Sequence, residues 1–206
     1  MAVKKLNPVD NKKILAREKS IERIKNAAIT LFSKHGFAPT TMDMIAKQAK
    51  ISKGLAYNYF KSKNQILEHI IDDHLNKQEV YYKNIPPNLS TKEYVREFFE
   101  RSLSFARDEQ KTVILLTVCF FQPGSVSLSK KMMDNIEKKF APFTDAMRER
   151  FCHLGIHNPD QEIMFIRTFL HGLFMGQVFH DHKVCPIKNV VDVLLERYNQ
   201  PAHKNN

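Results

Sequence analysis

Apolar residues recur in steps of three and four along almost the whole chain, a spacing that places them on one face of an α-helix. The clearest case lies between residues 127 and 154. Glycine is scarce, at 6 residues, and we find neither a βαβ rhythm nor the dipeptides typical of β-hairpins. The sequence therefore predicts an all-α fold of about nine helices. They are expected near residues 20–35, 40–49, 52–60, 62–83, 90–107, 112–121, 127–154, 158–181 and 186–198.

Local signals mark several helix ends. Ser62 and Gln65 are spaced as a capping box, as are Ser90 and Glu93. Gly36 ends the first helix. The apolar run 112–121 is typical of either a buried strand or a buried helix, and its helical neighbours favour a helix. Pro142 predicts a kink, because proline removes a hydrogen bond inside a helix.

Residues 40–63 predict two short helices joined by a tight turn. Thr40 or Thr41 caps the first helix, with Asp43 in its first turn, and Ser52 caps the second. Apolar residues of both helices face inward, and one fills the turn: Met44, Ile45, Ala49, Ile51, Leu55, Ala56 and Phe60. This arrangement is typical of a helix-turn-helix, whose second helix enters a DNA major groove.

The outward residues of the second helix are donors for phosphates and base edges, near a helix N-terminus that favours an anion. Gly54 adds no side chain where a backbone approaches closely. The outward residues are Ser52, Lys53, Gly54, Tyr57, Asn58 and Tyr59, followed by Lys61 and Lys63. An amphipathic hairpin without a DNA-binding role also carries polar residues outside, so the pattern alone leaves both interpretations open.

A larger set of residues between Ile24 and Leu67 has a characteristic mutual spacing. The set is Ala27, Ala28, Leu31, Phe32, Gly36, Phe37, Thr40, Thr41, Ile45, Ala46, Ala49, Ser52, Lys53, Gly54, Tyr57, Tyr59, Phe60, Lys63 and Leu67. In these positions the sequence resembles the DNA-binding domain of the TetR family of bacterial transcriptional regulators. The resemblance covers about a fifth of the chain.

The resemblance implies a role for each matching residue. Thr41, Tyr57 and Lys63 would hold the DNA backbone. Residues at or near the groove would be Lys53, Gly54, Leu55, Asn58 and Tyr59, with Lys53 and Asn58 reading bases. Ser52 is a further candidate for a DNA contact. Two positions depart from the family pattern. Lys50 stands where a turn glycine is usual, so a left-handed backbone there would cost about 1 kcal/mol. Leu55 stands where a small or hydroxyl residue is common, which suggests an apolar contact to a thymine methyl.

The positive charge is concentrated at the same end of the chain. Residues 1–63 hold 14 Lys or Arg and 4 Asp or Glu, a balance of +10, whereas residues 64–206 hold 18 of each and balance at zero. This segregation favours a polyanion partner, and the N-terminal segment lacks the broad apolar face of a membrane-surface helix. We therefore expect double-stranded DNA as the partner and no membrane association.

The other compositional features predict a cytoplasmic protein. Cys119, Cys152 and Cys185 form no disulfide or zinc pattern, and no apolar run is long enough for a membrane span. His180, His182 and Cys185 are the one metal-like cluster, but their spacing matches no strong pattern, and a solvated helix end explains them. We expect neither metal nor cofactor.

We do not expect an enzyme either, because no GxSxG, HExxH or phosphate-binding glycine loop is present. The alternatives are a nonspecific DNA-binding structural protein and, after it, an enzyme that uses the C-terminal helical cavity.

The predicted domains are a flexible basic arm at 1–17, a helix-turn-helix domain at 18–63, and a helical effector-binding and dimerisation domain at 64–206. The arm is either a frayed tail or a segment that adds phosphate or minor-groove contacts. The helix at 158–181 is apolar nearly all round and needs burial on every side, which favours a homodimer. The expected dimer contacts are Phe174, Val178, Val190, Val193 and Leu194.

The TetR resemblance also implies a cavity for a small effector in the C-terminal domain. Such a cavity would suit a hydrophobic molecule, aromatic or fatty, that releases a repressor from its operator. The candidate lining residues are Phe99, Phe120, Phe143, Met147, His171 and Met175.

Overall fold

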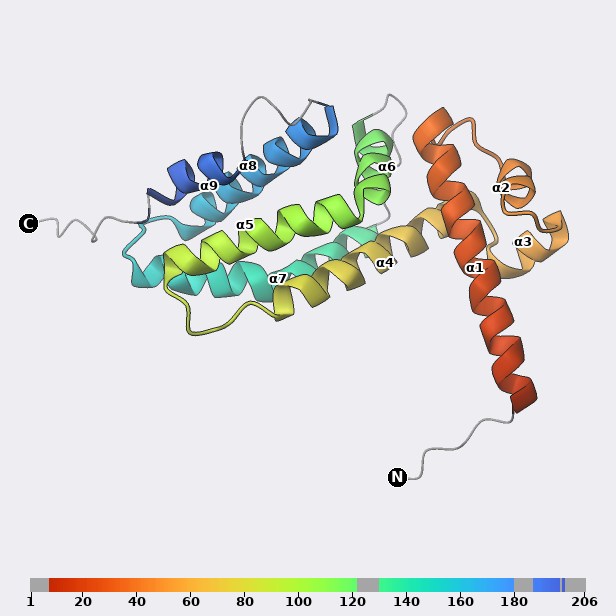
Figure 1. Cartoon of the computed structure of the whole chain (residues 1–206), viewed down its shortest axis with the longest axis horizontal. Helices are drawn as coiled ribbons and strands as arrows, with labels where there is room; N and C mark the ends of the chain where they lie inside the picture. The colour runs from red at the N-terminus through yellow and green to blue at the C-terminus, as the bar shows by residue number, and fades with distance from the viewer. Residues whose placement is uncertain (1–7, 122–129, 180–186, 197, 199–206) are drawn as a thin grey trace, which may run out of the picture. The chain divides into compact units, whose positions relative to one another are not determined.

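The fold is described from a computed structural model, which describes residues 8–121, 130–179, 187–196 and 198. All regular elements within these ranges are helices, which confirms the predicted all-α class (Figure 1). The described ranges contain nine helices: α1 (Pro8–His35), α2 (Met42–Gln48), α3 (Lys53–Tyr59), α4 (Lys63–Lys83), α5 (Thr91–Asp108), α6 (Gln110–Phe121), α7 (Lys130–His153), α8 (Pro159–Phe179) and α9 (Ile187–Glu196).

The chain divides into two compact units. Unit 1 comprises Met1–Asp73 and Lys111–Ser127, and so contains α1, α2, α3, the first half of α4, and α6. Unit 2 comprises His74–Gln110 and Leu128–Asn206, and contains the rest of α4 with α5, α7, α8 and α9.

The first helix begins well before its predicted start. It was expected from about Ser20, but α1 begins at Pro8. Proline is suited to the first helical position, because its missing N–H has no partner there and its fixed φ is helical. The stretch from residue 12 to residue 19 is exposed and has no apolar face, so hydrophobic periodicity could not predict it. Residues 8–17 therefore form a helix where a flexible arm was predicted.

The other helix boundaries follow the local signals closely. At α5, the Ser90 side chain accepts from the Glu93 N–H while Glu93 accepts from the Ser90 N–H, so the capping box is present. At α4, Ser62 accepts from the Gln65 N–H, but the Gln65 side chain returns to the N–H of Lys61 instead. The ambiguous apolar run 112–121 is helical, as predicted.

Unit 1 has its core where α1 meets α2 and α3. Ile24, Ala28 and Phe32 of α1 are fully buried, together with Ile45 of α2 and Ala56 of α3. Met42 is buried and Met44 is only half-buried, so the prediction of Met44 as the inward methionine was wrong. Met42 is the first residue of α2, three positions before Ile45, and therefore shares its face.

The core of unit 2 is aromatic. Tyr82 of α4 stacks on Phe98 of α5, with ring centroids 5.0 Å apart, and meets Phe143 of α7 edge-on at 4.7 Å. The Tyr82 hydroxyl lies 2.8 Å from the Ser102 hydroxyl and accepts a hydrogen bond from Gln78 at 3.0 Å. This burial raises the pKa of Tyr82, and the two hydrogen bonds satisfy its polar end.

Candidate nucleic-acid interface

The turn between α2 and α3 is built by caps at both helix starts and one left-handed residue. The Thr41 hydroxyl accepts from the Met44 N–H, and the Ser52 hydroxyl accepts from the Leu55 N–H, both at 3.2 Å. Lys50 has φ 54°, the left-handed conformation considered for this position. The turn closes through the Ile51 N–H, which donates to the carbonyl of Ala46 at 3.1 Å.

Helix α3 is anchored by a few apolar residues and presents the rest to solvent. Ala56 is fully buried and Phe60, which follows the helix, is 1% exposed. Leu55 and Tyr59 are half-buried. The exposed residues are Ser52, Lys53, Gly54, Tyr57 and Asn58. The predicted DNA-contacting side chains of α3 therefore share its outer face, with Leu55 and Tyr59 at its edge.

Gly54 leaves open space on this outer face. A Cβ atom added at Gly54 would meet no atom of the chain within 4 Å. The sequence predicted that another group approaches the backbone closely at Gly54, and no atom of the described chain does so. The open space leaves room for a ligand to reach the α3 backbone.

Lys53, the predicted base reader, is held by a residue that sequence reasoning did not assign to the site. Its ammonium donates to Asp43 of α2 at 2.8 Å, and both side chains are more than half exposed. The hydrogen bond to Asp43 raises the pKa of Lys53, so the group is cationic. The pair crosses the turn from α3 back to α2. A helical spacing pattern cannot reveal it.

Lys63, predicted to contact a phosphate, donates to three backbone carbonyls of the loop between α1 and α2. Its ammonium lies 2.8 Å from the carbonyl oxygen of Phe37, 2.7 Å from that of Ala38 and 3.0 Å from that of Thr40. It also lies 4.6 Å from the centroid of the Phe37 ring. Burial lowers the pKa of Lys63. Because an ammonium has three N–H donors, these carbonyls use its whole donor set.

Thr40 is buried and also stabilises the loop between α1 and α2. Its hydroxyl donates to the Gly36 carbonyl at 2.8 Å, and its side chain is 0% exposed. Thr41, which is exposed, is the residue that caps α2. The two threonines therefore have different positions: Thr40 closes the loop, and Thr41 stands at the surface where a phosphate contact was predicted.

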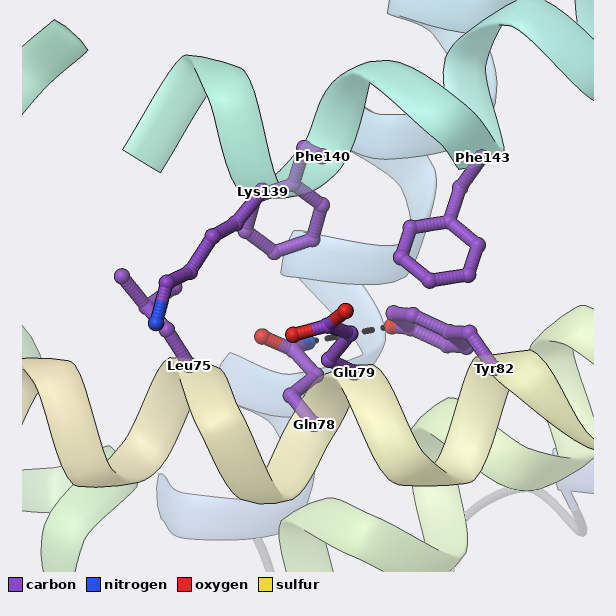
Figure 2. A pocket seen from close by; sticks show the side chains of 7 residues that line it. All are labelled: Leu75, Gln78, Glu79, Tyr82, Lys139, Phe140 and Phe143. Carbon is purple, nitrogen blue, oxygen red and sulfur yellow. Dashed lines mark hydrogen bonds between the residues drawn. The ribbon is translucent and has the colours of Figure 1, made fainter. Parts of the chain in front are cut away.

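One of the predicted effector residues lines a hollow in unit 2. The described hollow in unit 2 lies between α4 and α7, with an empty volume of about 150 Å³. Its lining residues are Leu75, Gln78, Glu79, Tyr82, Lys139, Phe140 and Phe143, and Figure 2 shows those of α4 facing those of α7. Small-molecule sites are roughly 300–1,000 Å³. The described hollow is smaller than that.

Phe143 is the one predicted effector residue in this lining. Phe99 and Met147 lie in the core of unit 2, Met175 is half-buried and His171 is exposed. The side chain of Phe120 lies outside the described residues.

The predicted dimer residues lie in two settings. Val193 of α9 is 67% exposed, whereas Leu194 is 4% exposed and belongs to the core of its own unit. Phe174 is half-buried, and the side chains of Val178 and Val190 lie outside the described residues. The sequence did not single out Met164 and Phe165 of α8, which are 69% and 40% exposed. One side of the apolar α8 therefore remains uncovered.

Two further features concern metals and membranes. The described ranges contain no group of three or more potential metal ligands. His180, His182 and Cys185 lie outside those ranges. Among the helices of the described chain, none is long and apolar enough to cross a bilayer.

Unit 1 has the geometry of a helix-turn-helix protein: two short capped helices, a tight turn, and polar side chains on the outer face of the second helix. Residues 24–70 match the family described as "Bacterial regulatory proteins, tetR family". The resemblance to this family that the sequence predicted is thus confirmed for residues 24–70.

Curated relatives resemble the chain over part of its length. YerO of Bacillus subtilis, an uncharacterised HTH-type transcriptional regulator, is 37% identical over 102 residues, or 46% of this chain and 34% of its own. YhgD of the same organism, described in the same terms, is 32% identical over 123 residues, or 58% and 62% of the two chains. IcaR of Staphylococcus aureus, a negative regulator of a biofilm operon, is 43% identical over 58 residues, or 27% and 31%. The aligned region thus spans from about a third to three fifths of these relatives.

Solved structures resemble the chain over nearly its whole length. A tetR-family regulatory protein from Rhodococcus RHA1 has a TM-score of 0.69 at 17% identity, covering 86% of this chain and 94% of its own. The fatty acid degradation regulator FadR of Bacillus halodurans has a TM-score of 0.65 at 15% identity, covering 94% and 95%. At these identities the likeness concerns the fold.

Proposed function

We propose that the chain is a homodimeric, sequence-specific DNA-binding transcriptional regulator, and that it acts as a repressor released from its operator by a small hydrophobic ligand. The observation that carries this proposal is the outer face of α3. It combines Lys53, Tyr57 and Asn58, all exposed, with the open space at Gly54. Donors of this kind on a helix that fits a major groove can contact both phosphates and base edges.

The charge distribution supports the same partner. The whole excess of +10 lies in residues 1–63, the part of the chain that contains α1, α2 and α3. Cationic side chains that neutralise phosphates release counterions from DNA, which gives both affinity and a strong salt dependence.

The residues divide into two roles in this proposal. Thr41, Tyr57 and Ser52 position the protein on the DNA backbone, whereas Asn58 and Lys53 read base edges. Asn58 is the best reader by chemistry, because an amide can both donate to and accept from adenine. Lys63 acts by holding the loop that leads into α2, since its three donors are used by Phe37, Ala38 and Thr40.

Dimerisation is supported by the uncovered apolar surface of unit 2. Met164, Phe165 and Val193 are exposed on α8 and α9, and exposed apolar residues on neighbouring helices are typical of a protein interface. A twofold dimer would present two copies of α3 to two half-sites, about one turn of the duplex apart.

Effector release is supported by the chemistry of unit 2. The core around Tyr82, Phe98 and Phe143 is aromatic, and the hollow beside it is narrow. A hydrophobic ligand that enters this core would have to separate α4 from α7. Since α4 also begins at Lys63 in unit 1, such a ligand would favour a state that binds the operator less well. IcaR is named as a negative regulator, which agrees with a repressor. FadR is named as a regulator of fatty acid degradation, so fatty acids are the first ligands to test.

The test is selection of duplexes from a random pool by the purified protein, followed by sequencing. We expect enrichment of a palindrome with two half-sites. Asn58→Ala should change the preferred bases, whereas Asn84→Ala, an exposed substitution in unit 2, should leave them unchanged. Enrichment of no sequence above background would reject the sequence-specific regulator and leave a nonspecific DNA-binding protein.

A further inference from the structure

Two side chains from the middle of α1 contact residues at the two ends of α3. Near the start of α3, Arg23 donates to the carbonyl oxygen of Lys50 at 2.8 Å. At the end of α3, the Arg17 guanidinium lies 5.9 Å from the centroid of the Tyr59 ring. The six-residue step from Arg23 to Arg17 spans about 9 Å of helix, close to the roughly 10 Å of a seven-residue α3. The start of α3 therefore lies near Arg23 and its end near Arg17, closer to the start of α1.

Helix α1 continues past the end of α3. From Arg17 to its start at Pro8 it extends for about 13 Å more. Figure 1 shows this end of α1 projecting beyond α3. Every side chain from Lys12 to Lys19 is exposed, including the apolar Ile14 and Leu15. Packing within unit 1 thus gives no reason for this extension.

The basic residues of the extension are divided between two faces of the helix. Residues 12–19 hold four basic side chains and one acidic one, Glu18. At about 100° per residue, Lys13 lies only about 40° around the helix from Arg17, whereas Lys12 and Lys19 lie about 140–160° away from it. Lys13 and Arg17 therefore form a stripe that continues from Tyr59, and Lys12 and Lys19 lie on the far side.

We infer that Lys13 and Arg17 form a second contact with duplex DNA, binding phosphates beside the segment that α3 reads. The inference rests on the proposed function. Its support is charge complementarity on the face of α1 nearest to Tyr59 of α3, at side chains that are exposed. Arg17 suits this role because its guanidinium can stack on Tyr59 while its N–H donors remain directed to a phosphate. The extension thereby enlarges the phosphate-binding surface without adding base contacts.

The test compares two double variants that remove the same charge from the same helix. One is Lys13→Ala with Arg17→Ala, and the control is Lys12→Ala with Lys19→Ala. Dissociation constants are measured over a series of salt concentrations on two probes, a random-sequence 40-base-pair duplex and the duplex enriched by selection. Each lost phosphate contact lowers the slope of log K against log salt by about 0.9. We expect the first variant to lower it by about 2 per chain on both probes, and the control to leave it nearly unchanged.

The outcomes separate this inference from the proposed function. Equal losses in both double variants would mean a general charge effect and would overturn the inference, as would no loss in either. If the wild-type chain enriches no sequence, the proposed regulator fails, and the random-sequence duplex still decides between the two faces. Because Arg17 contacts Tyr59, the single variant Lys13→Ala, at an exposed position, is included. It should lower the slope by about 0.9 with unchanged thermal unfolding.

Discussion

Arg23 of α1 donates a hydrogen bond to the carbonyl oxygen of Lys50, the residue in the α2–α3 turn whose φ is 54°. The bond joins the long first helix to the one described non-glycine residue in the left-handed region. Since an L-residue there is strained by its Cβ, the turn is held by its surroundings: Arg23 from one side and the Ile51–Ala46 hydrogen bond from the other.

Replacing Lys50 with glycine should therefore stabilise the protein. Glycine removes the Cβ strain of about 1–2 kcal/mol but gives the unfolded chain more freedom, so the expected net gain is about 0.5–1 kcal/mol. Urea unfolding measures the gain. The control Lys50→Ala removes the same charge and keeps a Cβ atom, and it should give no comparable gain. Equal stabilities of the two variants would show that the turn is not strained by its side chain.

Lys63→Met should destabilise unit 1. The substitution keeps an apolar stem but removes the donors to the carbonyls of Phe37, Ala38 and Thr40, for an expected loss of about 1–2 kcal/mol. The matched control is Lys61→Met. Lys61 is exposed and makes one longer bond of 3.3 Å to the Tyr57 carbonyl. Equal free energies of unfolding in the Lys63 and Lys61 variants would mean that Lys63 does not stabilise the loop and can act in DNA binding only.

Asp43→Asn should strengthen DNA binding. It removes a negative charge two residues after Thr41 and releases Lys53 from its ion pair, which is exposed and so weak in water. We expect about threefold tighter binding to random-sequence duplexes at low salt, a change of less than 1 kcal/mol. Fluorescence anisotropy of a labelled duplex measures it. Asp145→Asn, which breaks an exposed pair with Arg148 in unit 2, is the control, and equal gains in both variants would argue against a role for Asp43.

His74 should make the folded state less stable in mild acid. Burial lowers the pKa of His74 from 6.5 to about 4; Glu109 opposes this shift and Lys77 reinforces it. Its Nδ1 atom is buried without a hydrogen-bond partner in the described structure. Between these two pKa values the unfolded chain binds the proton and the folded chain does not, so stability falls as the pH drops from above 6.5 towards 4.

The change attributable to His74 between pH 7.5 and pH 5 is about 2 kcal/mol. His74→Gln should remove that part of the pH dependence of urea unfolding, whatever its effect on stability at neutral pH. His153→Gln alters an exposed histidine and should keep the wild-type profile. A His74 variant with an unchanged profile would place the acid sensitivity elsewhere.

The sequence predicted features that depend on neighbouring residues and missed those that depend on distant ones. The capping box of Ser90 and Glu93 is a local signal, and the structure contains it. The three carbonyls held by Lys63 lie 23 to 26 positions earlier in the chain, and no periodic pattern reports such a contact. The same reason applies to Asp43, which holds Lys53 across the turn.

Hydrophobic periodicity also cannot predict the exposure of residues when that exposure depends on what covers them. Leu194 and Val193 are neighbours of similar character, yet one lies in the core and the other in solvent. His171 falls within an apolar helix, yet it is exposed. Likewise, the extension of α1 before Ser20 has no apolar stripe and went unrecognised as a helix.

The shortness of α3 has a consequence for local stability. The helix has seven residues and buries only Ala56 among them. A helix of this length does not persist in water alone, because too few hydrogen bonds follow its costly nucleation. Its amide protons should therefore exchange with solvent through local opening, well before those at fully buried Phe32 in α1. A duplex bound to the outer face of α3 must also keep this helix folded. Part of the favourable free energy of binding therefore offsets the cost of ordering α3, which opens transiently in the free protein.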